Sequence, residues 1–500
     1  MKRIFLLAAI ALMSLSVQAQ AQFGEKPKLV VGLVVDQMRW DYLDRYYNQF
    51  TEGGFRRLID QGYSCNNCLI NYVPTVTAIG HTSAYTGTTP AFHGICGNNF
   101  FINGKKVVSC QDDSVKAVGS NANFGNRSPR NLLATTIGDQ LRLHTDFKSK
   151  VIGVSYKDRA AIFPAGHSAN AAYWLDTKNL CFITSTYYMT ELPDYVKQVN
   201  ADIKKNKEVQ KAGERIGYTP LCGTITTDMA IAALKGEQLG KGSSTDMICI
   251  SYSQTDVIGH EWGTRGERTD AAYLTLDRDL QRLFQALDQE VGRGQWVAFL
   301  TADHGAAHNW RFQKEHKLPG GPLYNDDLKK GIYEHLKSTL GIEKKVIADI
   351  LDYRIFLNND VLENAEEREK VINGIVDYVR TLPTYATAYA FDCIRTAPLP
   401  ERLTEQILKG YYRGRSGDII MIPKPHYYSS WKGAPEGQTT HGEWNPYDAH
   451  IPCLFYGWHI PQGATSREVH IVDIAPTICQ LLHIQQPSAC IGEAITEITK

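Results

Sequence analysis

Short apolar runs, each followed closely by polar residues, recur along this chain. They cover residues 29–35, 151–154, 247–252 and 297–300, and the polar residues after them include Asp36, Lys157, Asp256 and Asp303. Continuous apolar runs rich in β-branched residues are typical of central strands in a parallel sheet that is buried on both faces. Helical patterns at 129–143 and 271–287 lie between the runs. This alternation predicts an α/β sandwich with a central, mostly parallel sheet and helices on both faces.

The polar residues that follow these runs are expected to share one site. In open α/β sheets, ligands bind beyond the carboxyl ends of the strands. Asp36, Lys157, Asp256 and Asp303 each follow the C-terminal end of a predicted strand. The sequence therefore predicts a single polar site at this edge of the sheet.

A segment of different character lies at about 309–430. Charged helical patterns alternate there with strand-like runs, at 325–340, 360–380 and 401–412 and at 353–357 and 418–422 respectively. We interpret this segment as an inserted α+β cap. Core-like sequence resumes at 451–457, and an apolar helix is expected after Thr477. Residues 22–500 are thus expected to form one catalytic domain that carries the insertion.

The N-terminus has the three parts of a secretory signal peptide. Lys2 and Arg3 precede an apolar stretch at 4–13, and the small-residue pattern Ala19-Gln20-Ala21 follows. Cleavage near Ala19 or Ala21 would remove residues 1–21 and leave a periplasmic or secreted protein. The alternative is a membrane anchor, but about 30 Å of hydrocarbon needs a longer apolar stretch.

Charge and cysteine content narrow the classes of partner. Lys plus Arg and Asp plus Glu number 53 each, so no net field favours nucleic acid or an anionic membrane, and we expect a small-molecule partner. The 11 cysteines are scattered and odd in number, unlike those of a disulfide-dense scaffold. Cys65 and Cys68 form a CxxC pair without a second pair at metal spacing. That pattern indicates a local disulfide or two structural cysteines.

Aspartate and histidine residues gather near the ends of the predicted strands. The potential metal ligands are Asp36, Asp256, His260, Asp303, His304 and His441. An isolated Asp-His pair is more often part of a surface loop or a core histidine with a hydrogen-bond partner. Together, however, these residues supply six donors, enough for two open zinc sites. Carboxylate oxygen combined with imidazole nitrogen is typical of zinc, whereas magnesium and calcium favour oxygen alone.

A hydroxyl suited to nucleophilic attack stands where a helix is predicted to begin. Thr77 occupies this position in Thr75-Val-Thr77-Ala-Ile-Gly80, and Gly80 leaves room for close packing. There the hydroxyl would face the free N–H groups of the first turn and the positive end of the helix dipole. An ordinary helix cap is the alternative interpretation. A zinc ion on the hydroxyl oxygen would instead make it a nucleophile.

Seven ordered motifs cover nearly the whole chain after residue 21. They are Leu33-Val-Val-Asp36-Gln, Pro74-Thr-x-Thr77-x-x-Gly80-His81, Gly87-Thr-Thr-Pro90-x-x-His93-Gly94, Ser253-x-Thr255-Asp256-x-x-Gly259-His260, Thr301-Ala-Asp303-His304-Gly305, Thr440-His441-Gly442 and Asp473-Ile-Ala-Pro476-Thr477. Jointly they resemble the alkaline phosphatase superfamily. Within it, the chain is similar to the periplasmic alkaline phosphatases of the PafA kind, which use threonine in place of serine.

The resemblance implies a role for each candidate residue. It assigns Asp256, His260 and His441 to one Zn²⁺, which stabilises the leaving oxygen and later activates water, and Asp36, Thr77, Asp303 and His304 to a second Zn²⁺, which activates the nucleophile. The implied activity is hydrolysis of small phosphate monoesters through a phosphothreonine on Thr77.

The surroundings of the phosphate distinguish monoesterases from diesterases. A monoester dianion has three nonbridging oxygens, and two zinc ions can partly neutralise only two of them. Lys157 and Arg159 resemble the Lys-x-Arg pair that grips phosphate in PafA-like monoesterases, and Asn98 resembles the amide that contacts another phosphate oxygen. A solvated charged loop and a turn residue are the alternative interpretations. The adjacent Asn99 is the alternative to Asn98 for the amide contact.

Three other functions share parts of this pattern. A type I phosphodiesterase or nucleotide pyrophosphatase has the same metal core and threonine, but the pair Lys157 and Arg159 argues against it. A sulfatase needs a Cys or Ser matured to formylglycine, which Thr77 cannot supply. A zinc-dependent binding protein without activity is disfavoured because the ligands and the nucleophile are all present.

Overall fold

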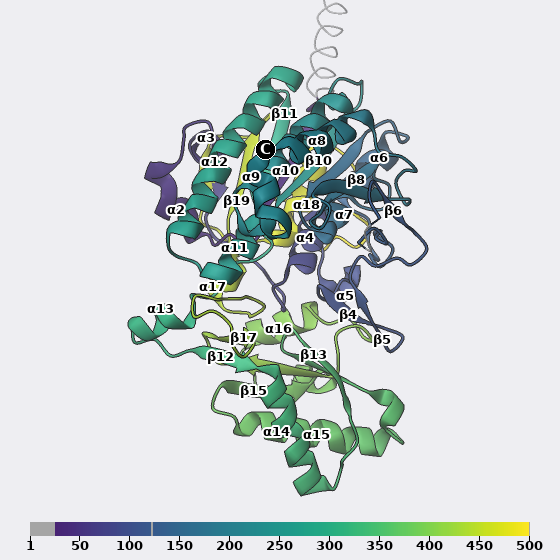
Figure 1. The fold of residues 1–500 in the computed structure, drawn as a ribbon, viewed down its shortest axis with the longest axis vertical. Helices are drawn as coiled ribbons and strands as arrows, with labels where there is room; N and C mark the ends of the chain where they lie inside the picture. The colour runs from purple at the N-terminus through teal and green to yellow at the C-terminus, as the bar shows by residue number, and fades with distance from the viewer. Residues whose placement is uncertain (1–25, 122–123, 500) are drawn as a thin grey trace, which may run out of the picture.

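The structure is a computed structural model that describes residues 26–121 and 124–499. The predicted signal peptide at 1–21 lies outside the described residues. Figure 1 shows a larger α/β body and a smaller group of helices and strands below it in the view. The larger body holds the first and last described segments of the chain.

The larger body is built on a ten-stranded sheet of order β20-β2-β19-β11-β1-β10-β7-β8-β9-β6. Its strands are β1 (Leu29–Val35), β2 (Tyr63–Cys65), β6 (Ala117–Val118), β7 (Val151–Ser155), β8 (Ala171–Asp176), β9 (Cys181–Ser185), β10 (Asp246–Tyr252), β11 (Trp296–Thr301), β19 (Cys453–Gly457) and β20 (Gly463–Thr465). The five central strands, β11 to β8, run parallel, and the pairs β11–β19 and β8–β9 that flank them are antiparallel. The sheet is therefore mixed, with a parallel centre.

Helices cover both faces of this sheet. Cys249 in β10 donates from its thiol to the carbonyl of Pro164, in α7 (Asp158–Ala165). Tyr252, three residues later in the same strand, lies 3.0 Å from the hydroxyl of Thr227 in α10 (Leu221–Gly236). Because successive side chains of a strand point to opposite faces, α7 and α10 lie on opposite sides of the sheet. The predicted α/β sandwich is confirmed.

The remaining helices of the larger body extend these two layers. On the α7 side, α4 (Thr77–Thr86) packs against α7, α6 (Ile137–His144) and α18 (Ile474–Leu481). On the other side, α10 packs against α8 (Asp194–Lys205) and α12 (Glu267–Leu287), and α11 (Gln254–Trp262) packs against α12. Shorter helices are α2 (Asp41–Tyr46), α3 (Phe55–Gln61), α5 (Pro90–His93), α9 (Lys207–Ala212) and α17 (Pro446–Ala449).

The segment predicted to form a cap has sheets and a hydrophobic cluster of its own. One sheet has the order β13 (Ile347–Leu351), β14 (Arg354–Leu357), β16 (Ile419–Pro423) and β15 (Tyr385–Ala390), and a second pairs β12 (Gly321–Tyr324) with β17 (Tyr427–Ser430). The helices are α13 (Trp310–Glu315), α14 (Asn325–Leu340), α15 (Ala365–Thr381) and α16 (Glu401–Lys409). Ile332, Ile375 and Ile419 belong to a cluster that excludes the central sheet.

Small two-stranded and three-stranded sheets complete the fold. They combine β4 (Asn99–Ile102) with β5 (Lys105–Val108), and β3 (Cys68–Leu69) with β18 (His450–Ile451) and β21 (Val469–His470). Both members of the CxxC pair, Cys65 and Cys68, are buried and carry free thiols. Of the two alternatives for this pair, the structure shows structural cysteines rather than a local disulfide.

One helix begins later in the structure than the sequence pattern predicts. The pattern at 129–143 indicated a helix, but α6 begins only at Ile137. The side chain of Thr136 accepts from the Asp139 N–H, and the Asp139 carboxylate accepts from the Thr136 N–H. This reciprocal capping box makes Thr136 the N-cap, so the helix begins at the next residue. The spacing of Thr136 and Asp139 is the signal that would have found the boundary.

Candidate metal and phosphate site

Three neighbouring strands deliver the predicted ligands to one place. β1 pairs with both β10 and β11 in parallel register, so the carboxyl ends of these strands lie side by side. Asp36 follows β1, Asp256 lies in the first turn of α11 just after β10, and Asp303 follows β11. The three aspartates are almost completely buried. The prediction of one shared site at this edge is thus met for these carboxylates.

The ammonium group of Lys157 lies between two of the carboxylates. Its Nζ is 2.7 Å from Asp36 Oδ2 and 2.6 Å from Asp256 Oδ2. Burial alone would lower the pKa of Lys157, but the carboxylates of Asp256 and Asp36 more than offset this effect and raise it. Lys157 is therefore a charged part of the site, and the alternative of a solvated loop is wrong for this residue.

Three histidines present Nε2 to the carboxylates, because Nδ1 of each ring bonds a backbone carbonyl. The Nδ1 atoms lie 2.8 Å, 3.0 Å and 2.7 Å from the carbonyl oxygens of Thr439, Gly305 and Thr75, for His260, His304 and His441 respectively. A carbonyl only accepts, so each Nδ1 carries a proton and donates it. In the neutral ring, Nε2 then has a free lone pair. A backbone hydrogen bond of this kind is the usual way in which proteins orient a histidine that binds a metal.

These lone pairs point at carboxylate oxygens. His260 Nε2 is 3.1 Å and His441 Nε2 is 3.6 Å from Asp256 Oδ1, and His304 Nε2 is 3.5 Å from Asp303 Oδ2. Burial lowers the pKa of His304 and of His441, which favours their neutral forms, whereas for His260 the effect of burial is outweighed by the Asp256 carboxylate, which raises its pKa. A neutral Nε2 and a carboxylate oxygen are both electron-pair donors, and a cation between them removes the repulsion.

The unpartnered atoms of the site fit the same cation chemistry. Asp36 Oδ1 and Asp303 Oδ2 are buried and accept no hydrogen bond of good geometry, although His81 Nδ1 lies 3.2 Å from Asp303 Oδ2. Burial, followed by the charge of Asp303, raises the pKa of Asp36 well above its usual value. Both effects are what metal ions relieve, because a dication stabilises clustered carboxylates and fills their free coordination positions. The residues present therefore fit a bound metal.

Among the described residues, two groups of three side chains could each hold a metal ion: Asp256, His260 and His441, and Asp36, Asp256 and His304. Within each group, the potential ligand atoms lie within 4.8 Å of one another. The first group matches one predicted zinc site. The second contains Asp256 where the prediction has Asp303, although Asp303 Oδ2 is only 3.5 Å from His304 Nε2. Asp256 thus lies between the two groups.

Thr77 is the first residue of α4 and faces this cluster. Its Oγ1 lies 3.4 Å from His304 Nε2 and 3.5 Å from Lys157 Nζ, and the side chain is buried. The capping position belongs to Val76, and no side chain caps the helix. The alternative in which Thr77 is an ordinary N-cap is therefore wrong. A Cβ on Gly80 would come within 2.2 Å of the Asp303 carbonyl oxygen, so glycine allows α4 to approach Asp303 closely.

Asn98 contacts the start of one helix, and Arg159 lies at the start of another. Asn98 Oδ1 accepts from the Ala78 N–H at 2.9 Å, in the first turn of α4, which leaves the amide NH₂ group available. Asn99 instead begins β4. Arg159 lies in the first turn of α7, beside Lys157, and its Nε is buried without a hydrogen-bond partner. The Asp158 carboxylate is 3.5 Å from Arg159 Nη1.

A buried chain of hydroxyls beneath the site was not found from the sequence. His81 Nδ1 is 2.9 Å from the Thr77 carbonyl, and its Nε2 is 2.8 Å from Ser251 Oγ. Ser253 Oγ is 3.1 Å from both Ser251 Oγ and Ser155 Oγ, and Ser155 Oγ accepts from the Lys157 N–H. The chain links α4 to the Lys157 loop. His81 and Ser253 stand in two of the seven motifs, but Ser155 and Ser251 lie on the strands β7 and β10, whose pairing had to be known.

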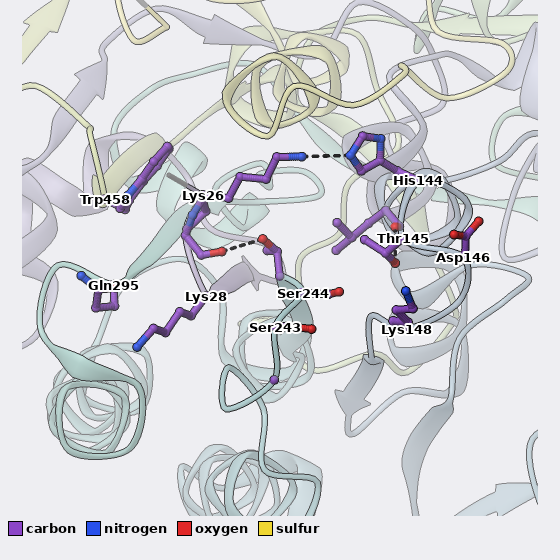
Figure 2. Close-up of a pocket in the computed structure, with 14 residues that line it drawn as sticks. Lys26, Lys28, His144, Thr145, Asp146, Lys148, Ser243, Ser244, Gln295 and Trp458 are labelled. Carbon is purple, nitrogen blue, oxygen red and sulfur yellow. Dashed lines mark hydrogen bonds between the residues drawn. The ribbon is translucent and has the colours of Figure 1, made fainter. Parts of the chain in front are cut away.

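A pocket of about 590 Å³ lies elsewhere in the fold, at the opposite edge of the sheet. Figure 2 shows its polar lining, including Lys26, Lys28, Lys148 and His144, with Lys26 Nζ 2.9 Å from His144 Nε2. Lys28 precedes β1 and Lys148 precedes β7, so the pocket lies at the N-terminal ends of the parallel strands. Ligand sites of open α/β sheets lie at the other end, where the aspartates and histidines gather.

Comparisons with known proteins show which family the chain belongs to. A model of the family "Type I phosphodiesterase / nucleotide pyrophosphatase" matches residues 30–448. Alkaline phosphatase PafA from Elizabethkingia meningoseptica is 41% identical, over 95% of this chain and 94% of its own length. A protein named calcium-transporting ATPase from Myroides odoratus is 42% identical, over 95% of both chains.

A crystal structure of wild-type alkaline phosphatase PafA has the same fold. It matches with a TM-score of 0.90 at 40% identity, over 95% of this chain and 99% of that chain. In the described part of this chain, no helix is both long and apolar enough to cross a membrane. The chain therefore belongs to the type I phosphodiesterase/nucleotide pyrophosphatase family of the alkaline phosphatase superfamily, and within that superfamily it is of the PafA type.

Proposed function

We propose that the protein hydrolyses small phosphate monoesters through a covalent phosphothreonine on Thr77, with two Zn²⁺ ions as cofactors. One observation carries the proposal. The buried Thr77 hydroxyl caps no helix and lies within 3.5 Å of both His304 Nε2 and Lys157 Nζ. A hydroxyl that faces a histidine of the metal cluster and a cation at once has the surroundings of a nucleophile whose target is an anion.

The ligands divide into two sets, which are Asp256, His260 and His441 for one Zn²⁺, and Asp36, Asp303, His304 and Thr77 for the other. Bound zinc supplies Lewis acidity, which lowers the pKa of hydroxyl groups and water and offsets charge on phosphate oxygens. Carboxylate oxygen mixed with imidazole nitrogen supports zinc over magnesium or calcium.

Thr77 forms the bond to phosphorus. Its oxygen attacks in line as the bond from phosphorus to the ester oxygen breaks, and the alcohol leaves. Water then cleaves the phosphothreonine, which releases inorganic phosphate and restores the Thr77 hydroxyl. The start of α4 favours this product because the positive end of a helix dipole stabilises a phosphate group.

The phosphate oxygens are held by Lys157, Arg159 and Asn98. Lys157 balances Asp36 and Asp256 in this structure. With dications held by these carboxylates, the Lys157 ammonium would be available to bind a phosphate oxygen. Arg159 has an Nε without a partner, and Asn98 has its NH₂ group free because its oxygen accepts from Ala78. These donors act where charge rearranges in the transition state.

A type I phosphodiesterase is the second candidate, and the description of the matching family favours it. A diester has one charged oxygen fewer than a monoester, and needs space for a second substituent. The positively charged side chains of Lys157 and Arg159, together with the amide of Asn98, fit the monoester better. The terminal phosphate of ATP has the same three nonbridging oxygens as a monoester, so ATP belongs among the test substrates.

The two candidate activities differ in how they respond to the loss of Lys157 or Arg159. Lys157→Ala and Arg159→Ala should each lower kcat/KM for an aryl phosphate monoester by about 10²-fold or more. They should lower kcat/KM for a diester with the same leaving group much less. Lys330→Ala is the matched control, because Lys330 is an exposed lysine of α14 whose partner is Glu334, at 3.8 Å. Equal losses on both substrates would reject the monoesterase assignment.

Removal of metal and of the nucleophile test the rest of the proposal. Exhaustive chelation should abolish hydrolysis, and two equivalents of Zn²⁺ per chain should restore it. Thr77→Ala should keep both zinc equivalents while hydrolysis is almost lost. Activity that survives chelation would overturn the metal assignment, and a fully active Thr77→Ala would place the nucleophile elsewhere.

We also propose that the protein is exported to the periplasm or beyond. The basic, apolar and small-residue segments of 1–21 support this location. N-terminal sequencing of protein recovered outside the cytoplasm should begin after Ala19 or Ala21. A mature protein that still begins at Met1 would contradict export by cleavage.

A further inference from the structure

Gln37, directly after Asp36, has a backbone conformation that is rare for its residue type. Its φ is +63° and its side chain is 3% exposed. Glycine adopts this left-handed region freely because it has no Cβ to crowd the backbone, and asparagine and aspartate adopt it because their short polar side chains hydrogen-bond locally. A buried glutamine held in this conformation indicates that the surroundings gain something from it.

The conformation lets one residue hold two aspartates. The Gln37 side chain donates from Nε2 to Asp256 Oδ1 at 2.6 Å, and its backbone N–H donates to Asp303 Oδ1 at 3.1 Å. Asp303 Oδ1 also accepts from the His304 N–H, so Oδ2, which lies 3.2 Å from His81 Nδ1, is the oxygen directed at a metal. Asp256 Oδ1 is the oxygen nearest His260 and His441. The two bonds therefore orient carboxylates that belong to different candidate zinc sites.

Space for this side chain comes from a glycine of another motif. A Cβ on Gly259 would lie 1.9 Å from Gln37 Oε1, so only glycine fits opposite the amide. The direction of the amide is set by chemistry as well. If it were reversed, Oε1 would face the Asp256 carboxylate and two acceptors would meet. Gln37 and Gly259 thus form a matched contact behind the site.

We propose that Gln37 is a positioning residue that sets the geometry of both metal sites, through Asp256 by its side chain and through Asp303 by its backbone. The inference rests on the proposed function, because it assumes that the two groups of ligands bind metal. It assigns Gln37 no contact with substrate. It also predicts that the two sites depend on different atoms of the residue, which makes them separable.

Gln37→Gly removes only one of the two interactions. Glycine adopts a φ of +63° freely and keeps the N–H that reaches Asp303. The donor to Asp256 is lost, and groups that orient metal ligands in this way are typically worth about 10–100-fold in affinity. We expect zinc affinity to fall by about this factor at the site of Asp256, His260 and His441, and to remain at the wild-type value at the other site.

Competition with a chromophoric chelator resolves the two zinc-binding steps, and the visible spectrum of the cobalt-substituted protein reports the geometry of each site. Gln37→Asn is a second variant, because asparagine tolerates the left-handed region but its amide is one carbon too short. It should lose affinity at the same site. Gln238→Gly is the matched control, an exposed glutamine with φ +55° that should leave both steps unchanged.

Three results would overturn the inference, and they are distinguishable. Wild-type affinity at both sites in Gln37→Gly would show that the side chain orients nothing. Equal weakening of both sites together with a lower urea midpoint would show a general structural role. Wild-type protein without stoichiometric zinc would remove the proposed function itself, and the role of Gln37 with it.

Discussion

Substitution of Gly80 by alanine tests how closely the nucleophile must be held against the metal cluster. Gly80 lies one turn after Thr77 in α4. A Cβ at this position would lie 2.2 Å from the Asp303 carbonyl oxygen and 2.5 Å from its Cα and Cβ. These are mainly backbone atoms at the end of a central strand, so no flexible side chain can turn aside. The helix and the strand end must therefore move apart.

The size of the displacement follows from the contact distance. Ordinary van der Waals contact begins at about 3.4 Å, so the helix must shift by about 1.2 Å from its 2.2 Å approach. Overpacking of this kind costs about 1–3 kcal/mol of unfolding free energy. Because Thr77 is in the same helix, its hydroxyl moves relative to Asp303 and His304. A misplacement of about 1 Å lowers turnover by about 10²-fold.

The assay compares kcat/KM for a phosphate monoester with the unfolding free energy from urea denaturation. Gly374→Ala is the control, because its nearest neighbours are the flexible side-chain ends of Leu336 and Leu340, at 2.8 Å and 2.9 Å. It should leave turnover unchanged, and helix propensity favours alanine by about 1 kcal/mol. A Gly80→Ala protein with wild-type kcat/KM would refute the reasoning, because α4 could then move without consequence for the reaction.

Three further changes probe the surroundings of the site. Asn98→Ala removes both the acceptor for Ala78 and the free amide, so it should lose turnover and about 1–3 kcal/mol of unfolding free energy; Asn98→Asp keeps the acceptor and should lose turnover alone. A turnover of the Asp variant equal to wild type would show that the NH₂ group contacts no phosphate. Ser253→Ala interrupts the hydroxyl chain and should lower monoester turnover several-fold at an unchanged urea midpoint; unaffected turnover would mean that the chain does not hold Lys157. Burial raises the pKa of Asp448 to about 8, so the folded protein keeps a proton that the unfolded chain loses near pH 4. The unfolding free energy should therefore fall between pH 4 and 8, with a flatter slope in Asp448→Asn; identical slopes would contradict this assignment.

The parts of the fold that could be predicted are those whose signal is local. β1, β7, β10 and β11 are buried along their whole lengths, and their continuous apolar runs were recognisable for that reason. α14 has the predicted bounds because its apolar positions recur at helical spacing up to the C-cap Gly341. Helix starts were less certain. The pattern at 360–380 began too early, since Asn364 caps α15 and the helix begins at Ala365.

The interactions that complete the site join positions far apart in the chain. His441 Nδ1 is oriented by the Thr75 carbonyl, 366 positions earlier, and His260 by the Thr439 carbonyl, 179 positions later. A carbonyl group is present at every residue, so no residue type marks these two. Gln37 stood in a quoted motif, but its role depends on a backbone angle that its neighbours in sequence do not reveal. The ligand types could be read from the sequence, whereas their orientation could not.

Charge balance connects these details to the choice of substrate. Asp36, Asp256 and Asp303 with a monoester dianion bring five negative charges to the site. Two proposed dications and Lys157 bring five positive charges, and Arg159 is already shared with Asp158. A diester carries one negative charge less and would leave a buried positive charge without a partner, which is costly. Lys157→Ala should therefore lower the ratio of kcat/KM for a monoester to kcat/KM for a diester, because it removes the positive charge that only the dianion requires.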